Sequence, residues 1–205
     1  MASGMTIKDA VNEMVETIGE YPLGASAATP DGTGTSIYDR ARQFLDREDK
    51  RMQSMGWPEN TVMSKEFTAS GGDIGIPNTI LRVRAAGSSA HRNMIIRDDS
   101  GTQKLYDGNA DTFAFGSTEK VYLDVVSKLD FIDLPPLMQD VVVAKSKMEF
   151  QRRIQGSPQV DAALMQDYAV SQAALDRHPM VAEQPFNTQP LMAGGGGGNR
   201  EQGKK

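Results

Sequence analysis

The sequence contains no cysteine, only two histidines and a single tryptophan, and aromatic residues make up 6% of its 205 residues. Without cysteine the chain has no disulfide bond, no thiolate zinc ligand and no cysteine nucleophile, which fits assembly in a reducing cytoplasm. The two histidines, His91 and His178, are far apart in sequence, and neither has a partner at metal-ligand spacing.

Long apolar runs and an excess of positive charge are also missing. No stretch approaches the about 18 consecutive apolar residues of a membrane span, and the first residues lack the apolar core of a secretion signal. The formal net charge is −5 and the pI is about 5.1, whereas tight phosphate binding requires clustered lysine and arginine. We therefore expect a soluble protein that contacts no membrane, is not conventionally secreted and does not grip DNA.

Residue patterns typical of catalysis are equally scarce. The glycine-rich run 71–75 around Asp73 lacks the lysine and the hydroxyl residue of a phosphate loop. Asp107, Asn109 and Asp111 alternate as in calcium loops, but the expected glycine and terminal glutamate are missing, so turn chemistry explains them better. No nucleophile motif is present. We expect no enzyme activity, no catalytic residue, no cofactor and no metal.

The N-terminal region predicts an amphipathic helix with defined ends. An apolar stripe with helical spacing covers residues 6–18, and Thr6 and Asp9 have the spacing of a capping box. Gly19 supplies a left-handed C-terminal end, and Pro22 prevents continuation of the helix.

A loop of small and polar residues, 25–35, separates this helix from a second one. Ser36 and Asp39 repeat the cap spacing, and the second helix ends at Gly56. We expect the ring of Trp57 to close the end of a helical bundle rather than to bind a ligand. The polar face has charges of both signs, which indicate either a solvated surface or an intersubunit salt-bridge surface. These charged residues are Arg40, Arg42, Asp46, Arg47, Glu48, Asp49, Lys50 and Arg51.

Residues 59–128 favour β-structure. Five β-prone runs, separated by clusters of Ser, Asp, Gly and Asn, lie at 61–68, 79–83, 93–97, 103–106 and 120–126. Gly101 can adopt the positive φ that a tight hairpin loop needs. We expect a small, mostly antiparallel sheet.

Two further helices follow. Pro135 begins a helix that extends to about residue 155, and its apolar surface is wide for a free surface helix. We expect this helix to be sandwiched, either within the bundle or against a neighbouring copy. Gly156 ends it, and Ser157 and Pro158 begin the fourth helix.

The C-terminal residues from 179 onward are punctuated by proline and include a run of five glycines at 194–198. This composition cannot build a core alone. The segment is either a disordered tail or a tail that orders on a partner, with Phe186, Leu191 and Met192 as anchors.

Together these patterns predict an α+β fold. We expect an antiparallel helical bundle of about four helices with an inserted, small, mostly antiparallel β-sheet domain and an extended C-terminal tail. The expected regions are 1–58 for the N-terminal helix pair, 59–133 for the inserted domain, 134–178 for the C-terminal helix pair and 179–205 for a flexible, partner-binding tail.

The helical ends of the chain carry a specific order of residues, here called the motif residues. They are Asn12, Gly19, Glu20, Pro22, Arg51, Gln53, Gly56, Trp57, Pro135, Phe150, Gly156 and Pro158. In order and spacing they resemble the tail tubular protein A family of short-tailed, podovirus-type bacteriophages, the head-to-tail adaptor or gatekeeper. The resemblance covers the two helical ends and not the middle.

This resemblance implies a structural virion protein that is assembled in the host cytoplasm. In the family the protein forms a ring, a dodecamer, that docks on the portal after DNA packaging and receives the tail nozzle, tail tubular protein B. DNA passes through the lumen without sequence-specific binding, and tail fibres are a further candidate partner. The glycine-rich tail itself does not match the family pattern, but in adaptors of this kind a C-terminal segment commonly reaches along the portal. We therefore predict that the tail binds the portal through Pro185, Phe186, Leu191 and Met192.

Two other classes of protein stay open on the sequence alone. A small nucleic-acid-binding regulatory protein also has short capped helices, but it should carry a basic stripe with a recognition helix, and the charges of residues 40–51 are mixed. A small hydrolase would need a convergent polar site, which the sequence does not show.

Overall fold

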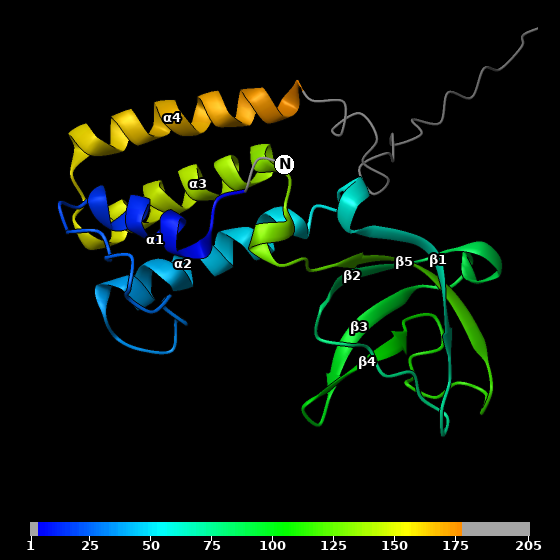
Figure 1. Cartoon of the computed structure of the whole chain (residues 1–205). Coiled ribbons are helices and arrows are strands. Elements are labelled where there is room, and N and C mark those ends of the chain that lie inside the picture. Colours follow the sequence, from blue (N-terminus) through cyan, green and yellow to red (C-terminus); the bar gives the residue numbers. More distant parts are fainter. Residues whose placement is uncertain (1–3, 178–205) are drawn as a thin grey trace, which may run out of the picture.

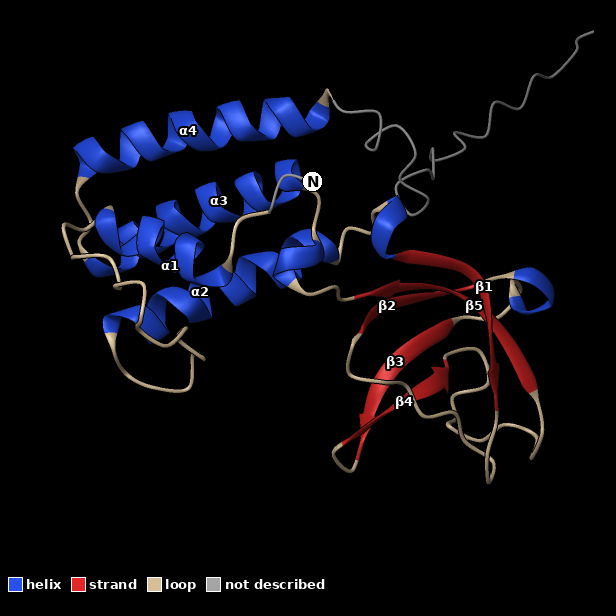
Figure 2. Ribbon diagram, viewed as in Figure 1, coloured by secondary structure: helices blue, strands red, loops and turns tan. Residues whose placement is uncertain are grey.

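The computed structural model describes residues 4–177, which form an α+β structure of four α-helices and five strands (Figures 1 and 2). The helices are α1 (Ile7–Glu16), α2 (Ile37–Gln53), α3 (Pro136–Ile154) and α4 (Pro158–Asp176). The strands are β1 (Thr61–Thr68), β2 (Ile80–Ala85), β3 (Met94–Asp99), β4 (Thr102–Asp107) and β5 (Lys120–Ser127). Each expected helix and strand is present, with ends shifted by at most a few residues.

The ends of α1 and α2 follow the predicted capping chemistry. The Thr6 hydroxyl accepts a hydrogen bond from the backbone N–H of Asp9, and the Asp9 carboxylate accepts one from the backbone N–H of Thr6. Ser36 caps α2 by the same contact with the Asp39 backbone. Gly19 has a φ of 80° and Gly56 a φ of 84°, so both glycines adopt the left-handed conformation expected after a helix end.

The strands form two sheets and not the single sheet that we expected. One sheet has the order β1-β5-β2, and β3 pairs with β4 in the other; every pair is antiparallel. The β3–β4 loop consists of Ser100 and Gly101, with φ of 55° and 85°, which matches the tight two-residue hairpin expected at Gly101. The two sheets share one apolar core, in which Leu105 of β4 and Leu123 of β5 are fully buried.

The helices have a core of their own, built mainly by α1, α2 and α3. It includes Val11 and Met14 of α1, Leu45 of α2 and Phe150 of α3. Ten residues of α3 are buried, and this helix packs against α1, α2 and α4, so the expected sandwiching of α3 occurs within one chain. From α4, Leu175 belongs to this core and the half-buried Tyr168 packs against it. Figure 1 shows α4 along α3, with α1 and α2 on the other side of α3.

Among the helices of residues 4–177, none combines the length and the apolar character that crossing a bilayer requires. The expected portal-binding residues Pro185, Phe186, Leu191 and Met192 lie outside the described residues.

Candidate interaction surfaces on the helices

The motif residues near α1 shape the chain locally. The Asn12 side chain accepts a hydrogen bond from the backbone N–H of Leu23 at 2.8 Å and donates one to the Leu23 carbonyl at 3.2 Å. This pair of contacts fixes the turn that follows α1, which contains Gly19, Glu20 and Pro22. Glu20 and Pro22 are themselves exposed.

The motif residues at the end of α2 join the helices to the sheet region. The buried Gln53 amide donates to the Leu129 carbonyl at 3.0 Å and to Asp49 at 2.8 Å, and it accepts from the Leu129 N–H at 2.7 Å. Trp57 is 2% exposed, and its indole nitrogen donates to the Met52 carbonyl at 2.9 Å. Trp57 is therefore buried at the end of α2, and its indole nitrogen has the hydrogen-bond acceptor that burial requires. Burial raises the pKa of Asp49.

The remaining motif residues set the ends and the packing of α3 and α4. The Pro135 carbonyl accepts hydrogen bonds from the first turn of α3, and Pro158 occupies the first turn of α4. Gly156, with a φ of 69°, makes the turn between the two helices. Phe150 is fully buried and meets Phe44 of α2 edge to face, with ring centroids 5.8 Å apart. Apart from Arg51, Glu20 and Pro22, the motif residues support the fold rather than form a surface.

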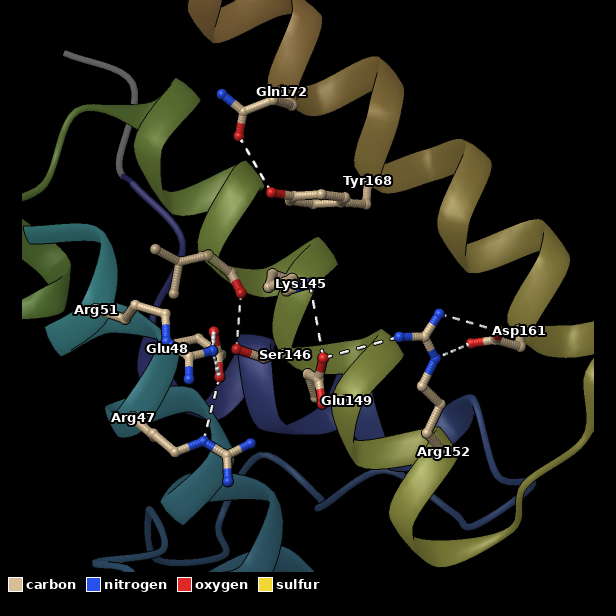
Figure 3. A network of polar contacts seen from close by, with 11 residues as sticks. Arg47, Glu48, Arg51, Lys145, Ser146, Glu149, Arg152, Asp161, Tyr168 and Gln172 are labelled. Atoms are coloured by element: carbon tan, nitrogen blue, oxygen red, sulfur yellow. Dashed lines mark hydrogen bonds and ion pairs between the residues drawn. The ribbon is translucent and has the colours of Figure 1, made fainter. Parts of the chain in front are cut away.

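The alternating charges of α2 separate into distinct faces in the structure. Glu48 and Asp49 are 3% and 1% exposed, so two of the acids that seemed to balance this helix are withdrawn from its surface. Arg47 and Arg51 project outward and both bind the Glu48 carboxylate, at 3.2 and 2.9 Å (Figure 3). Their side chains remain 47% and 66% exposed. The surface of α2 is therefore more basic than its sequence suggests.

An apolar groove lies beside these arginines, where α2, α3 and α4 meet. It encloses about 260 Å³, and Glu48, Arg51, Lys145 and Gln172 also line it. Its apolar lining consists of Met52, Met55, Val141, Val142 and Tyr168. The Lys145 ammonium lies 5.0 Å from the centre of the Tyr168 ring, and the Tyr168 hydroxyl points toward Gln172 (Figure 3). Met55 is 52% exposed, so a methionine side chain stands open at this groove.

Helix α4 presents apolar side chains to solvent over most of its length. Only Leu164 and Leu175 of its 19 residues are buried, whereas Met165 is 52% and Val170 65% exposed. Four alanines are also exposed: Ala162, Ala163, Ala169 and Ala174. Polar residues such as Gln166, Asp167 and Gln172 are scattered around α4, so the helix has no continuous polar face, and exposed apolar side chains between them are suited to contact with a partner. The apolar character of the exposed face was not predicted, although the scattered polar residues are visible in the sequence.

A second hollow lies on the opposite side of the α3–α4 pair, next to α1. Its volume is about 380 Å³, and Glu13 of α1, Asp140 of α3 and Asp167 of α4 line it together with Lys147 and Val170. Lys147 binds Glu13 at 3.2 Å. Burial, and then the neighbouring charge of Glu13, raise the pKa of Asp140. This side of the helix pair is therefore acidic.

The aspartates of the region that resembles a calcium loop serve turn chemistry, as predicted. Asp107 accepts hydrogen bonds from the backbone N–H groups of Asn109 and Ala110, and it binds Arg92 at 2.7 Å. Burial opposes ionisation of Asp107, but these contacts outweigh it and lower its pKa. Within residues 4–177, no group of three or more His, Asp or Glu side chains is arranged to hold a metal ion.

These features describe a protein whose notable surfaces are apolar and charged faces suited to contact with other proteins. Comparison with known families agrees: a family model for tail tubular proteins matches residues 8–185. Because the match covers most of the chain, this protein belongs to the tail tubular protein family and is a structural component of the bacteriophage tail. The family implies assembly with other tail components. No curated protein matches the chain.

Proposed function

We propose that this protein is the head-to-tail adaptor of its phage. In this role it forms a ring, a dodecamer, that docks on the portal after DNA packaging, connects the portal to the tail nozzle and forms part of the channel for DNA ejection. Assembly takes place in the host cytoplasm. Membership of the tail tubular protein family and the exposed apolar face of α4 support this role.

The exposure of apolar side chains on α4 is the observation that supports this proposal most strongly. Fully burying one side chain such as Met165 or Val170 contributes about 1.5–3 kcal/mol, and in the monomer these side chains are more than half exposed. A subunit contact over α4 would recover this free energy. Such a contact would cover the face of α4 that points away from α3.

The remaining contacts belong to other parts of the chain. We propose that residues 179–205 bind the portal through Pro185, Phe186, Leu191 and Met192, and that the nozzle and, as a further partner, tail fibres bind elsewhere on the ring. Val62 and Met63 of β1 are 50% and 53% exposed and give the sheet region an apolar patch suited to such a partner.

Native mass spectrometry and electron microscopy, with and without the portal of the same phage, test the adaptor role. We expect rings, free or seated on the portal, that also capture the nozzle protein. Deleting residues 179–205 should weaken docking to the portal while the monomer stays folded by circular dichroism. A chain that stays monomeric and ignores the portal would refute the adaptor role.

A DNA-binding assay separates the adaptor from a nucleic-acid-binding regulator, which the exposed arginines of α2 favour. An acidic protein, with a net charge of −5, should let DNA pass without holding it. We expect the ring to bind duplex DNA weakly and with little dependence on salt. Tight binding that falls steeply as salt rises would favour the regulator instead.

We also propose that residues 1–58 and 134–178 form one helical bundle and that 59–133 is a domain inserted between its halves. The separate apolar cores of the helices and of the sheets support this division. A chain in which a short glycine-serine linker replaces residues 61–128 should keep its helical circular dichroism signal. Loss of all cooperative unfolding in this variant would contradict the division.

A further inference from the structure

The two sides of the α3–α4 pair carry opposite charge, and each side also holds an apolar element. On the side toward α2, the arginine side, Arg40, Arg47 and Arg51 share one stripe of α2, at spacings of seven and four residues. Glu48 is the carboxylate bound to Arg47 and Arg51, and within residues 4–177 Arg40 makes no ion pair. Two of these arginines, Arg47 and Arg51, therefore share one buried glutamate, and Arg51 lines the groove that contains Met55.

The opposite side, toward α1, is here called the acidic side. Glu13, Asp140 and Asp167 line its hollow, and Lys147 is the base among them. Lys147 binds Glu13, whereas Asp167 is exposed and has no ion pair among the residues that the structure describes. Three carboxylates therefore face one lysine, next to the exposed side chain of Val170.

We propose that the ring contact of this protein is head-to-tail across α4, with the acidic side of one copy docked on the arginine side of the next. Val170 of the first copy lies over the groove at Met55 of the second, and Asp167 approaches the arginine stripe. This inference rests on the proposed ring and names the two surfaces that build it.

A second copy of the chain fits each side, because the two sides are complementary in charge and in shape. The excess positive charge on one side matches the excess negative charge on the other, and the groove can receive the side chain that protrudes opposite it. Val170 and Tyr168 lie on different sides of α4, so both contacts can exist on one copy at once. Two different surfaces that bind each other generate a ring when the rotation closes, whereas one self-complementary surface gives only a dimer.

Glu48 prepares the arginine side for this contact. Its carboxylate is 2% exposed and holds the guanidinium groups of Arg47 and Arg51 at the surface, where their other N–H groups can reach an incoming carboxylate. Arg47 also lies 4.5 Å from the centre of the Phe44 ring, which further fixes its position. The stripe is therefore ordered before the neighbouring copy arrives, and less conformational entropy is lost on docking.

Charge reversal tests the pairing at exposed residues. Asp167→Lys alters an exposed residue that has no ion pair among residues 4–177, and Arg51→Glu alters an arginine whose side chain is 66% exposed and which lies about one helical turn from Met55. Each variant should keep the circular dichroism spectrum of the parent and should weaken ring assembly by about tenfold or more, because like charges then face each other. The double variant Asp167→Lys with Arg51→Glu should recover assembly. The control Glu59→Lys makes the same charge change at an exposed residue that lines neither hollow, and it should assemble like the parent. A double variant no better than the single variants would overturn the pairing.

Crosslinking tests the contact directly, because the chain has no cysteine of its own. With the portal present, a chain carrying Met55→Cys and Val170→Cys should give a ladder of covalent multimers with a short bis-maleimide. Each single-cysteine chain should stay monomeric, as should the control pair Met63→Cys with Val170→Cys. A covalent dimer from Val170→Cys alone would overturn the head-to-tail arrangement.

The outcome also separates this inference from the adaptor role. Rings that form under the microscope but yield no ladder through Met55 and Val170 would overturn the proposed contact surfaces and leave the ring standing. Chains that form no ring, with or without the portal, would overturn both.

Discussion

Helices α1 and α4 are both rich in apolar residues, but the apolar residues of α1 are mostly buried and many of those of α4 are exposed. Four of the 10 residues of α1 are buried, against two of the 19 residues of α4. Helix α1 packs against both α2 and α3, whereas α4 packs against α3. The shorter helix is part of the monomer's core, and the longer one lies on its surface. The apolar residues of α1 therefore serve folding, whereas most of those in α4 lie on the surface that we propose for assembly.

The same amino acid can be compared at both places. Met14 of α1 is fully buried, and Met165 of α4 is 52% exposed. Met14→Ala should lower the free energy of unfolding by about 3 kcal/mol, because it removes core contacts and leaves a cavity. Met165→Ala should change it by no more than about 0.5 kcal/mol. Urea unfolding of the monomeric chain, followed by circular dichroism, measures both values.

Met165→Ala should have little effect on unfolding but a clear effect on ring assembly. A Met165→Ala chain that unfolds like the parent should still form rings less readily, because the apolar face of α4 is smaller. Equal destabilisation by the two alanine substitutions would show that α4 belongs to the monomer core, and the contrast between the helices would then be lost.

Local chemistry explains which parts of the fold could be predicted from the sequence. Thr6 with Asp9, Gly19 and Gly101 each act through the backbone within a few residues, and each adopts the predicted conformation. The apolar stripe of α1 similarly needs only a helical period to be recognised. Helix ends, strand positions and the burial of Trp57 could therefore be predicted.

Features that depend on distant residues were not accessible. The division of five strands into two sheets is set by packing between segments far apart in sequence. Likewise, the mixed charges of α2 gave no sign that Glu48 and Asp49 would be buried while Arg40 stayed exposed. The arginine stripe of α2 emerges only because Glu48 and Asp49 are buried, and the acidic hollow combines residues from three helices, so the sequence predicted neither as a surface.

At the end of α2, the buried Gln53 side chain joins this helix to the segment that follows β5, and an exposed glutamine of the same helix provides a comparison. Gln53→Ala should lower the free energy of unfolding by about 2 kcal/mol, since the N–H and carbonyl of Leu129 then lose their buried partner. Gln43→Ala is a matched control on the same helix, because the exposed Gln43 amide donates a single hydrogen bond to the Gly32 carbonyl. Its effect should stay below about 0.5 kcal/mol. Equal effects of the two substitutions would mean that the Gln53 contacts do not join the two regions.

Of these changes, lowering the pH should affect stability least. It should destabilise the sheet region and, at Asp49, relieve a cost in the helices. In the sheet region, the hydrogen bond from the Gly116 N–H and then the contact with Arg92 lower the pKa of Glu119. Burial opposes ionisation of Asp107, but Arg92 and two backbone N–H groups outweigh it and lower the pKa of this carboxyl. A lowered pKa stabilises the fold above the ordinary value, and this stabilisation is lost as the pH falls through the folded-state pKa. In the helices, burial raises the pKa of Asp49, so the folded state takes up this proton more readily than the unfolded chain, and acid relieves a cost.

Amide hydrogen exchange, compared as protection factors at about pH 6 and about pH 3, measures this contrast region by region, because the lower pH lies below the ordinary pKa of both carboxyl groups. On acidification, protection in β4 and β5 should fall relative to protection in α2. Arg92→Gln removes the cation that lowers both carboxyl pKa values in the sheet region, so this variant should lose part of the difference between the regions. If β4, β5 and α2 instead lost protection in parallel, the helices and the sheets would unfold as one cooperative unit, and their separate apolar cores would not correspond to separate stabilities.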